Sequence, residues 1–518
     1  MLSGPIQEFA KKISNIKAGE SQGGTEMPFE VNQLISKATN FYEKVRYLVD
    51  YKEEHTIRRS AIERILRRKI IIEQKQKIGL SLVTELVSSQ YIPQTHLTEN
   101  AVEAIDKTVA KFLELKKLVG QNSSFNKKIL SLTASEIDRH LDTYRYLIDD
   151  AVIQTSYERV RGNIEIDQTL PENEVNIQLY CACRRNLLGF DDEMLMYTLW
   201  LMFVPNWLEI PENEVKDIAG NIVPVIHHIE AVIKNPLQWQ LARRLKNEMV
   251  YFLIIRELVQ QYGPESGRIL ENEVLLDNYV KSFLEKKYIK ENERIKSSGL
   301  RAVIYLFFTK VILALLIEMP YESYFLHAIN TLALSINIIF PPALLFAFTR
   351  HIKTLGEDNT KAVVSGIHTV VYSGEFRKLK VRTLTLYSRL SYVFTFFYLI
   401  FIALVFWGII AVLNILHFNI VSMMFFILFL TLVSYFAFRI RHNAKRWRVI
   451  KEGGAWGTIG NVLALPIVNA GRWMSQSFSA INFVVFLLDF VVETPLKFIL
   501  NFSNEFISYL KERVEEIR

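Results

Sequence analysis

The chain has 518 residues, which is too long for one compact hydrophobic core, so we expect two or more domains. Its 61 Lys and Arg outnumber its 54 Asp and Glu, yet residues 1–300 hold 40 basic against 42 acidic side chains. The whole excess of basic side chains therefore lies after residue 300, between apolar segments. This distribution excludes a nucleic-acid-binding domain, whose basic side chains would gather on the soluble part, and indicates the charge asymmetry of a membrane protein.

Apolar residues in the first 300 positions recur with the spacing of one helical face, for example over Phe29–Val49 and Leu97–Val119. Alternating strand patterns are nearly absent from this part of the sequence. The apolar run Met194–Pro205 would form a helix of about 18 Å, which cannot cross a hydrocarbon core of about 30 Å. We therefore predict a buried core helix at this position.

The first residues contain no apolar core long enough for a cleavable signal peptide. The sequence has two cysteines, Cys181 and Cys183, which exclude a disulfide framework and favour a reducing compartment. We therefore expect the first half of the chain in the cytoplasm.

Four later segments are apolar enough to predict transmembrane helices in two hairpins: Ala302–Ile317, Tyr324–Phe348, Leu390–Leu413 and Ile420–Phe438. The short connections Glu318–Ser323 and Asn414–Phe418 hold no Lys or Arg, whereas Arg350–Arg389 and Arg439–Glu452 are rich in both. Under the positive-inside rule the two basic connections and the amino-terminal half are cytoplasmic. We expect a multi-pass protein of the plasma membrane.

These patterns predict an all-α, polytopic integral membrane protein. Its expected parts are a flexible amino-terminal segment (1–27), two helical cytoplasmic subdomains (28–165 and 166–298), a transmembrane hairpin (299–349), a basic cytoplasmic loop (350–389), a second hairpin (390–438) and a carboxyl-terminal tail (439–518). Asp489 and Glu493 interrupt the apolar stretch 478–500, so we expect the tail to form amphipathic helices in the cytoplasmic membrane interface, with a fifth crossing as the alternative.

Polar residues gather on one side of the second predicted crossing, which must therefore face protein and not lipid. Pro341 and Pro342 lack the N–H groups that continue a helix, so we expect a kink or a stop near Phe340. Together with a lysine of the neighbouring segment, these residues form a candidate intramembrane polar site: Lys310, His327, Asn330, Asn337, Pro341 and Pro342.

This polar site has two interpretations. It could form an ion or proton path. Alternatively, the asparagines join helices, and Lys310 pairs with Asp489 or with carbonyls that the prolines release. We favour the second interpretation, because the other hairpin has no matching pair of prolines.

Other candidate residues have simpler interpretations. Cys181 and Cys183 would point about 200° apart on a helix and could not hold one metal ion, and the adjacent His227 and His228 fit surface histidines, so we expect no metal or cofactor. Basic side chains after the fourth segment are candidate contacts for anionic lipid headgroups: Arg439, Arg441, Lys445, Arg446 and Arg448.

No nucleotide-binding loop, nucleophile elbow or zinc-protease motif occurs in the sequence. We expect a non-enzymatic, membrane-anchored scaffold that presents helical cytoplasmic surfaces to a protein partner and does not bind nucleic acid. One alternative is a transporter or channel subunit that uses the polar site. Another is a membrane-bound enzyme acting on lipid through Asp489 and Glu493. A homo-oligomer is compatible with each.

Overall fold

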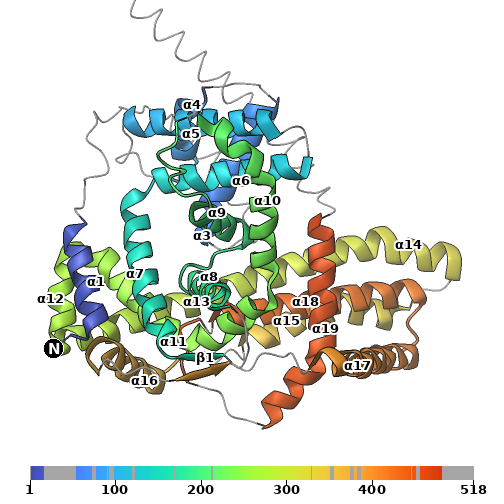
Figure 1. Cartoon of the computed structure of the whole chain (residues 1–518). Coiled ribbons are helices and arrows are strands. Elements are labelled where there is room, and N and C mark those ends of the chain that lie inside the picture. Colours follow the sequence, from blue (N-terminus) through green and yellow to red (C-terminus); the bar gives the residue numbers. More distant parts are fainter. Residues whose placement is uncertain are drawn as a thin grey trace, which may run out of the picture. The chain divides into compact units, whose positions relative to one another are not determined.

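The computed structural model describes residues 2–16, 54–72, 77–89, 91–92, 99–119, 123–166, 171–211, 214–327, 330–350, 355–373, 378–381, 387–444, 446–450 and 455–480. Helices make up nearly all of these ranges, which confirms the all-α prediction (Figure 1). The chain forms two compact units. The described residues of Met1–Asn272 and Thr369–Thr383 belong to unit 1, and those of Glu273–His368 and Leu384–Asn482 to unit 2.

Unit 1 is a body of helices with one short strand pair. Its elements are α1 (Gly4–Asn15), α3 (Glu54–Leu66), η1 (Arg67–Ile72), α4 (Gly79–Ser88), α5 (Glu99–Val119), α6 (Ser123–His140), α7 (Thr143–Arg161), β1 (Ile164–Ile166), α8 (Glu172–Leu188), α9 (Asp192–Phe203), α10 (Val215–Lys234), α11 (Pro236–Tyr262), η4 (Gly263–Glu265), α12 (Ser266–Glu271), η7 (Thr369–Ser373) and β2 (Leu379–Val381). The two strands run parallel, with Ile164 opposite Leu379.

The beginning of the chain is helical, although we expected a flexible segment there. Ile6, Phe9 and Ile13 lie on one face of α1 and are buried, which is the spacing that lets a helix cover a core. The backbone N–H of Ser3 donates to the carbonyl of Val371 at 2.8 Å, so the segment is also tied to the later part of unit 1.

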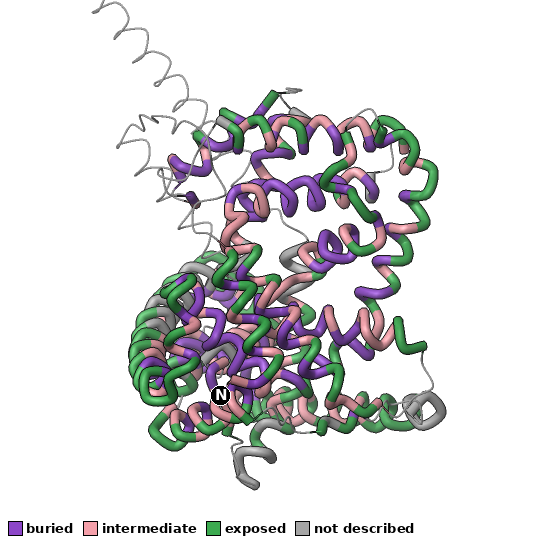
Figure 2. The backbone as a smooth tube through the Cα atoms, turned by 60° about the vertical axis from the view of Figure 1, so that its left-hand side comes forward, coloured by how far each residue is buried: buried purple, intermediate pink, exposed green. Residues whose placement is uncertain are grey.

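A hydrophobic core in unit 1 combines residues from both sides of position 165. The ring of Phe112 on α5 lies 6.5 Å from that of Trp200 on α9, and Trp200 lies 5.0 Å from Trp207. Helix α9 is the predicted buried core helix, and the Asp191 side chain caps it by accepting the N–H of Met194 at 2.8 Å. In Figure 2, buried and exposed residues alternate along the helices, as expected where one face packs on a core.

Glu136 is a carboxyl group buried in this core. It accepts a hydrogen bond from Nε1 of Trp207 at 2.6 Å and lies 3.4 Å from the Lys111 ammonium. Burial raises the pKa of Glu136, although both partners act in the opposite direction. Burial also lowers the pKa of His140 to about 4, assisted by the positive charges of Arg139 and Lys111.

Unit 2 is built from long helices joined by short segments. Its elements are α13 (Glu273–Leu313), η5 (Ala314–Glu318), α14 (Met319–Tyr321), η6 (Glu322–Leu326), α15 (Thr331–Arg350), α16 (Glu357–His368), α17 (Tyr387–Ile415), α18 (Ile420–Ala444) and α19 (Ala455–Ala480). The described part of the expected basic loop 350–389 is therefore helical where α16 and η7 form.

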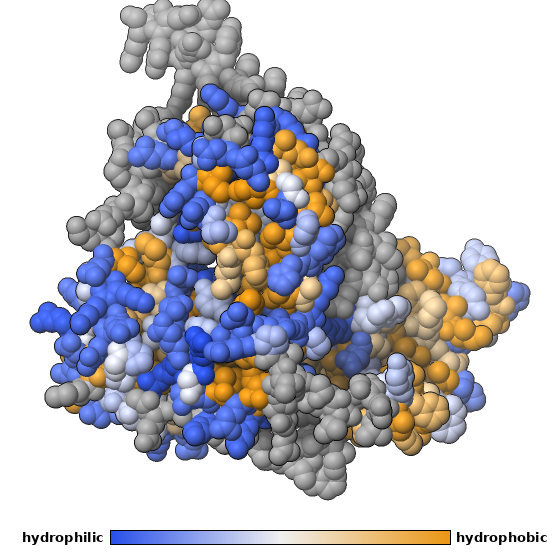
Figure 3. Space-filling view, viewed as in Figure 1, coloured by the Kyte–Doolittle hydropathy of each residue, from blue (hydrophilic) through white to orange (hydrophobic). Residues whose placement is uncertain are grey.

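Within the described ranges, three helices are long and apolar enough to cross a membrane: Thr331–Phe348, Tyr392–Ile415 and Ile420–Arg441. They correspond to the second, third and fourth predicted segments and indicate that the chain associates with a membrane. The first predicted segment, Ala302–Ile317, is divided between the end of α13 and η5 and is not among the three. Large apolar side chains cover the surface of α17, where Trp407 is 70% exposed (Figure 3).

Helix α19 packs directly on α18 at a glycine. A β-carbon at Gly471 would lie 2.0 Å from the carbonyl oxygen of Thr431, so the two backbones approach as closely as only glycine allows. Nearby, the Thr431 hydroxyl contacts Sδ of Met474 at 3.3 Å. This part of the expected interfacial tail is thus a helix in contact with α18. Residues 481–518, including Asp489 and Glu493, lie outside the described residues.

Candidate functional site

One helical stretch carries three ionisable residues into the apolar part of unit 2. From Glu273 the chain stays helical to Leu326, because α13 is followed without a break by the π-helical segments η5 and η6 with α14 between them. The predicted connection Glu318–Ser323 is therefore wrong: these residues are helical, and the helix ends at Leu326, before the left-handed backbone of His327. Single π-helical turns occur preferentially at functional sites.

Lys310 and Glu318 form a buried ion pair within this stretch. The Lys310 ammonium lies 2.7 Å from Oε1 of Glu318, and neither side chain is exposed. The same ammonium lies over the rings of Phe425 and Phe429 of α18, at 5.0 and 4.6 Å from their centroids, which adds cation–π attraction. Lys310 thus pairs with Glu318, whereas we expected Asp489 or released carbonyls as its partner.

Helices α15 and α18 supply neutral donors to the same carboxylate. Nδ2 of Asn337 donates to Oε2 of Glu318 at 2.6 Å and to the backbone carbonyl of Ser422 at 3.2 Å. The Ser422 hydroxyl also contacts Oε2 of Glu318, at 3.4 Å. Oδ1 of Asn337 is buried and has no hydrogen-bond partner among the described residues. Three donor groups therefore lie within hydrogen-bond distance of Glu318, while Asn337 keeps one unused acceptor.

A second carboxylate, Glu322, lies one helical turn farther on and is also buried. Its Oε1 accepts from Nδ2 of Asn419 at 2.5 Å and contacts the Ser422 hydroxyl at 3.5 Å. Its Oε2 accepts from the backbone N–H of Asn330 at 3.0 Å. Among the described residues, no Lys, Arg or His lies within ion-pair distance of Glu322.

We call this group the carboxylate cluster. It consists of Lys310, Glu318, Glu322, Asn330, Asn337, Asn419 and Ser422. Its ionisable members are two carboxylic acids and one amine, so if all three were ionised it would carry one uncompensated negative charge. Such a charge costs several kcal/mol in a low-dielectric interior, which makes the cluster the strongest candidate for a site that takes up a cation.

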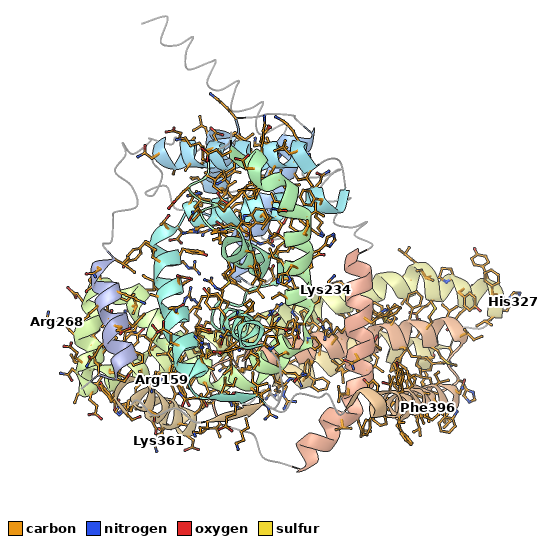
Figure 4. All side chains as sticks on the ribbon, in the orientation of Figure 1. Arg159, Lys234, Arg268, His327, Lys361 and Phe396 are labelled. Atoms are coloured by element: carbon orange, nitrogen blue, oxygen red, sulfur yellow. The ribbon has the colours of Figure 1, made fainter. Side chains whose placement is uncertain are left out.

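The other predicted members of the polar site have different roles. His327 is exposed at the tip of the helical stretch, where its φ of 53° ends the helix (Figure 4). Pro341 and Pro342 are buried inside α15, and the helix continues past them to Arg350, so the expected stop near Phe340 does not occur.

Four residues of the cluster were not predicted from the sequence: Glu318, Glu322, Asn419 and Ser422. Both glutamates were assigned to a water-exposed connection because they end an apolar run. The overlooked signal was their spacing: Glu318 and Glu322 are four residues apart, which is about one helical turn and puts both on one side of a helix.

The remaining candidates lie apart from the cluster. Arg439 and Arg441 are half-buried near the end of α18, and Arg446 and Arg448 are half-buried in the turn that follows; Lys445 lies outside the described residues. Asn359 of α16 fixes this turn by donating to the Trp447 carbonyl at 2.9 Å and accepting the Val449 N–H at 2.9 Å. The basic residues are thus held in place on unit 2.

Cys181 and Cys183 of α8 are buried, and burial raises the pKa of their thiols to about 11 and about 12. His227 and His228 are exposed. In the ranges that the structure describes, no group of three or more His, Cys, Asp or Glu side chains could hold a metal ion.

Comparisons of the chain with protein-family models, curated proteins and solved structures found no match.

Proposed function

We propose that the chain crosses the plasma membrane four times, with residues 302–326 as the crossing that precedes α15. These 25 residues would extend over about 37 Å as a helix, enough for a hydrocarbon core of about 30 Å. Lys310, Glu318 and Glu322 would make an isolated crossing costly, but their contacts with each other and with α15 and α18 offset that cost.

The proposed orientation follows from charge. The basic stretches 350–389 and 439–452 lie at the ends of α15 and α18 and would stay on the cytoplasmic side with the amino-terminal half. Arg439 and Arg441 on α18 and Arg446 and Arg448 after it would then meet the cytoplasmic leaflet, where anionic lipid headgroups attract them.

We infer that the protein is a subunit of a transporter or channel, in which the carboxylate cluster lies on the path of a proton or another small cation. The observation that carries this proposal is the complete burial of Lys310, Glu318 and Glu322 between apolar helices. Ionisable groups inside a membrane are expensive and mark ion pathways more often than they serve packing alone.

Flux into liposomes tests the proposal. Purified protein is reconstituted, and uptake of protons, Na⁺ and K⁺ is followed with ion-sensitive dyes under an imposed gradient. Lys310→Leu and Asn337→Leu should each abolish a flux that the wild type shows. Thr395→Val is the matched control, because Thr395 lies on the exposed surface of α17. A wild type without flux, or a flux that both cluster variants keep, contradicts the proposal.

A scaffold role remains the second candidate. It is favoured by apolar side chains that unit 1 leaves open to solvent: Leu80 and Trp239 are each 54% exposed and Met202 is 48% exposed. Such side chains suit a protein partner in the cytoplasm. Cross-linking in native membranes should then join one protein reproducibly to unit 1, and Met202→Glu or Trp239→Glu should weaken that cross-link.

A further inference from the structure

The hydroxyl of Ser422 lies between the two carboxylates of the cluster. It is 3.4 Å from Oε2 of Glu318 and 3.5 Å from Oε1 of Glu322. A hydroxyl has one proton to donate, so it can serve only one of these oxygens and presents a lone pair to the other. If both carboxylates were ionised, one of them would face that lone pair in a buried site. A proton on Glu318 or Glu322 removes the conflict.

The groups that face the carboxylates favour a proton over a metal cation. Glu318 is approached by the Lys310 ammonium and by Nδ2 of Asn337, and Glu322 by Nδ2 of Asn419 and the N–H of Asn330. A metal cation requires oxygen ligands and would have to displace these N–H donors. A proton needs only the contact with Ser422 that already exists.

Asn337 is suited to both protonation states of Glu318. Its Nδ2 donates to the ionised carboxylate, while its Oδ1 is buried and has no hydrogen-bond partner among the described residues. Rotation of the amide by half a turn would bring Oδ1 to Glu318, where it would accept the O–H of a protonated carboxyl. An unused acceptor in this position is costly unless a donor is present for part of the time.

The partners of the two carboxylates differ in burial: those of Glu322 include half-buried residues, whereas those of Glu318 are buried. Glu322 is contacted by Asn330 and Asn419, which are half-buried beside the turns that follow η6 and α17. Glu318 lies one turn earlier in the helix, beside the buried Lys310, whose ammonium lies over the rings of Phe425 and Phe429. Among the described residues that contact the carboxylates, Lys310 is the charged partner, and it contacts Glu318. The described partners of Glu322 are neutral and include half-buried residues. A proton would therefore enter at Glu322.

We propose that Glu322 and Glu318 exchange a proton through the hydroxyl of Ser422, so that the ion of the proposed transport function is H⁺. Protonated Glu322 donates its proton to Oγ of Ser422, and Ser422 releases its own hydroxyl proton to Oε2 of Glu318. One O–H bond breaks and one forms at Ser422, one breaks at Glu322, and one forms at Glu318. The negative charge moves from Glu318 to Glu322. This inference rests on the proposed function only for the direction and purpose of the transfer.

Infrared difference spectroscopy tests whether Glu318 or Glu322 carries a proton, and the measurement does not require transport. Protein in lipid nanodiscs is titrated with acid, and the carbonyl stretch of protonated carboxyl groups is recorded. We expect a band that Glu322→Gln removes and Ser422→Ala shifts, whereas Ser434→Ala on the same helix leaves it unchanged. A band unaffected by both Glu322→Gln and Glu318→Gln overturns the inference, as does a band that follows Na⁺ concentration instead of pH.

Proton flux in liposomes tests the relay. Ser422→Ala should slow the flux by about tenfold or more, because proton transfer through a positioned group is lost, whereas Ser422→Thr keeps the hydroxyl and should retain clearly more flux than Ser422→Ala. Equal flux in Ser422→Ala and wild type overturns the relay. A pH-dependent band of Glu322 in protein that carries no flux would support the shared proton while contradicting the transport function.

Discussion

The ammonium of Lys310 lies 2.7 Å from the carboxylate of Glu318, and neither side chain is exposed to solvent. Eight residues separate the two positions, so both side chains extend along the helix toward each other across the π-helical segment η5. A buried ion pair of this kind couples the two residues: removal of either partner leaves a charge without compensation.

Lys310→Met should destabilise the protein by about 3–5 kcal/mol, because Glu318 would keep a buried charge without its counterion. Thermal unfolding in detergent measures the change. The double variant Lys310→Met, Glu318→Gln should recover most of the loss, since it removes both charges and keeps similar volumes. Equal instability of the single and double variants would show that the pair is not coupled.

Gly471→Ala should displace α19 from α18. The added methyl group would lie 2.0 Å from the Thr431 carbonyl oxygen, and the overlap would cost about 1–3 kcal/mol or more. The measurement is disulfide formation between cysteines introduced by Thr431→Cys and Met474→Cys, whose native side chains are in contact. Gly460→Ala is the matched control, because Gly460 lies on the same helix with open space around it. Undiminished cross-linking in Gly471→Ala would contradict the close approach.

Trp207→Phe should destabilise unit 1 by about 1–3 kcal/mol or more, because buried Glu136 loses its 2.6 Å donor and the smaller ring leaves space beside Phe112 and Trp200. Cys181 and Cys183 provide the readout: they are the chain's two cysteines, both are buried in unit 1, and a thiol reagent reaches them only when that unit opens. Labelling should accelerate by about fivefold or more. Trp239→Phe, at a 54% exposed position, should leave the rate unchanged; equal rates in both variants would refute the role of the indole N–H.

His140 should make unit 1 less stable in mild acid. Its pKa is about 4 in the folded protein against 6.5 without the fold, so between these values the unfolded chain binds a proton that the folded chain does not. The stability that neutral His140 gives the folded unit is present in full above pH 6.5 and is lost as the pH falls toward 4. Labelling of Cys181 and Cys183 with a pyridyl disulfide, which reacts in acid, measures unit 1 stability across this range.

His140→Gln should flatten that pH dependence relative to wild type. Because the same measurement on both proteins includes Glu136 and every other titrating group, the difference between the two curves isolates His140. Superimposable curves would show that His140 does not carry the effect.

The helical class could be predicted, as could the three helices long and apolar enough to cross a membrane (α15, α17 and α18) and the buried helix α9, because each follows from local apolar spacing and length. The carboxylate cluster could not, because its partners are distant in sequence. Asn337 is 19 residues from Glu318, and Asn419 is 97 residues from Glu322. Without these contacts, two acidic residues at the end of an apolar run indicate a water-exposed turn, and only the packing of α15 and α18 reverses that interpretation.

Lys310, Glu318 and Glu322 lie within the membrane only if the helical stretch that ends at His327 crosses it. The most direct test is labelling of the thiol introduced by His327→Cys with a membrane-impermeant reagent on intact cells, beside Lys361→Cys on α16; both native positions are exposed. We predict that His327→Cys is labelled from outside and that Lys361→Cys is labelled only after the cells are permeabilised. Labelling of both from the same side would contradict the crossing and, with it, the intramembrane position of the cluster.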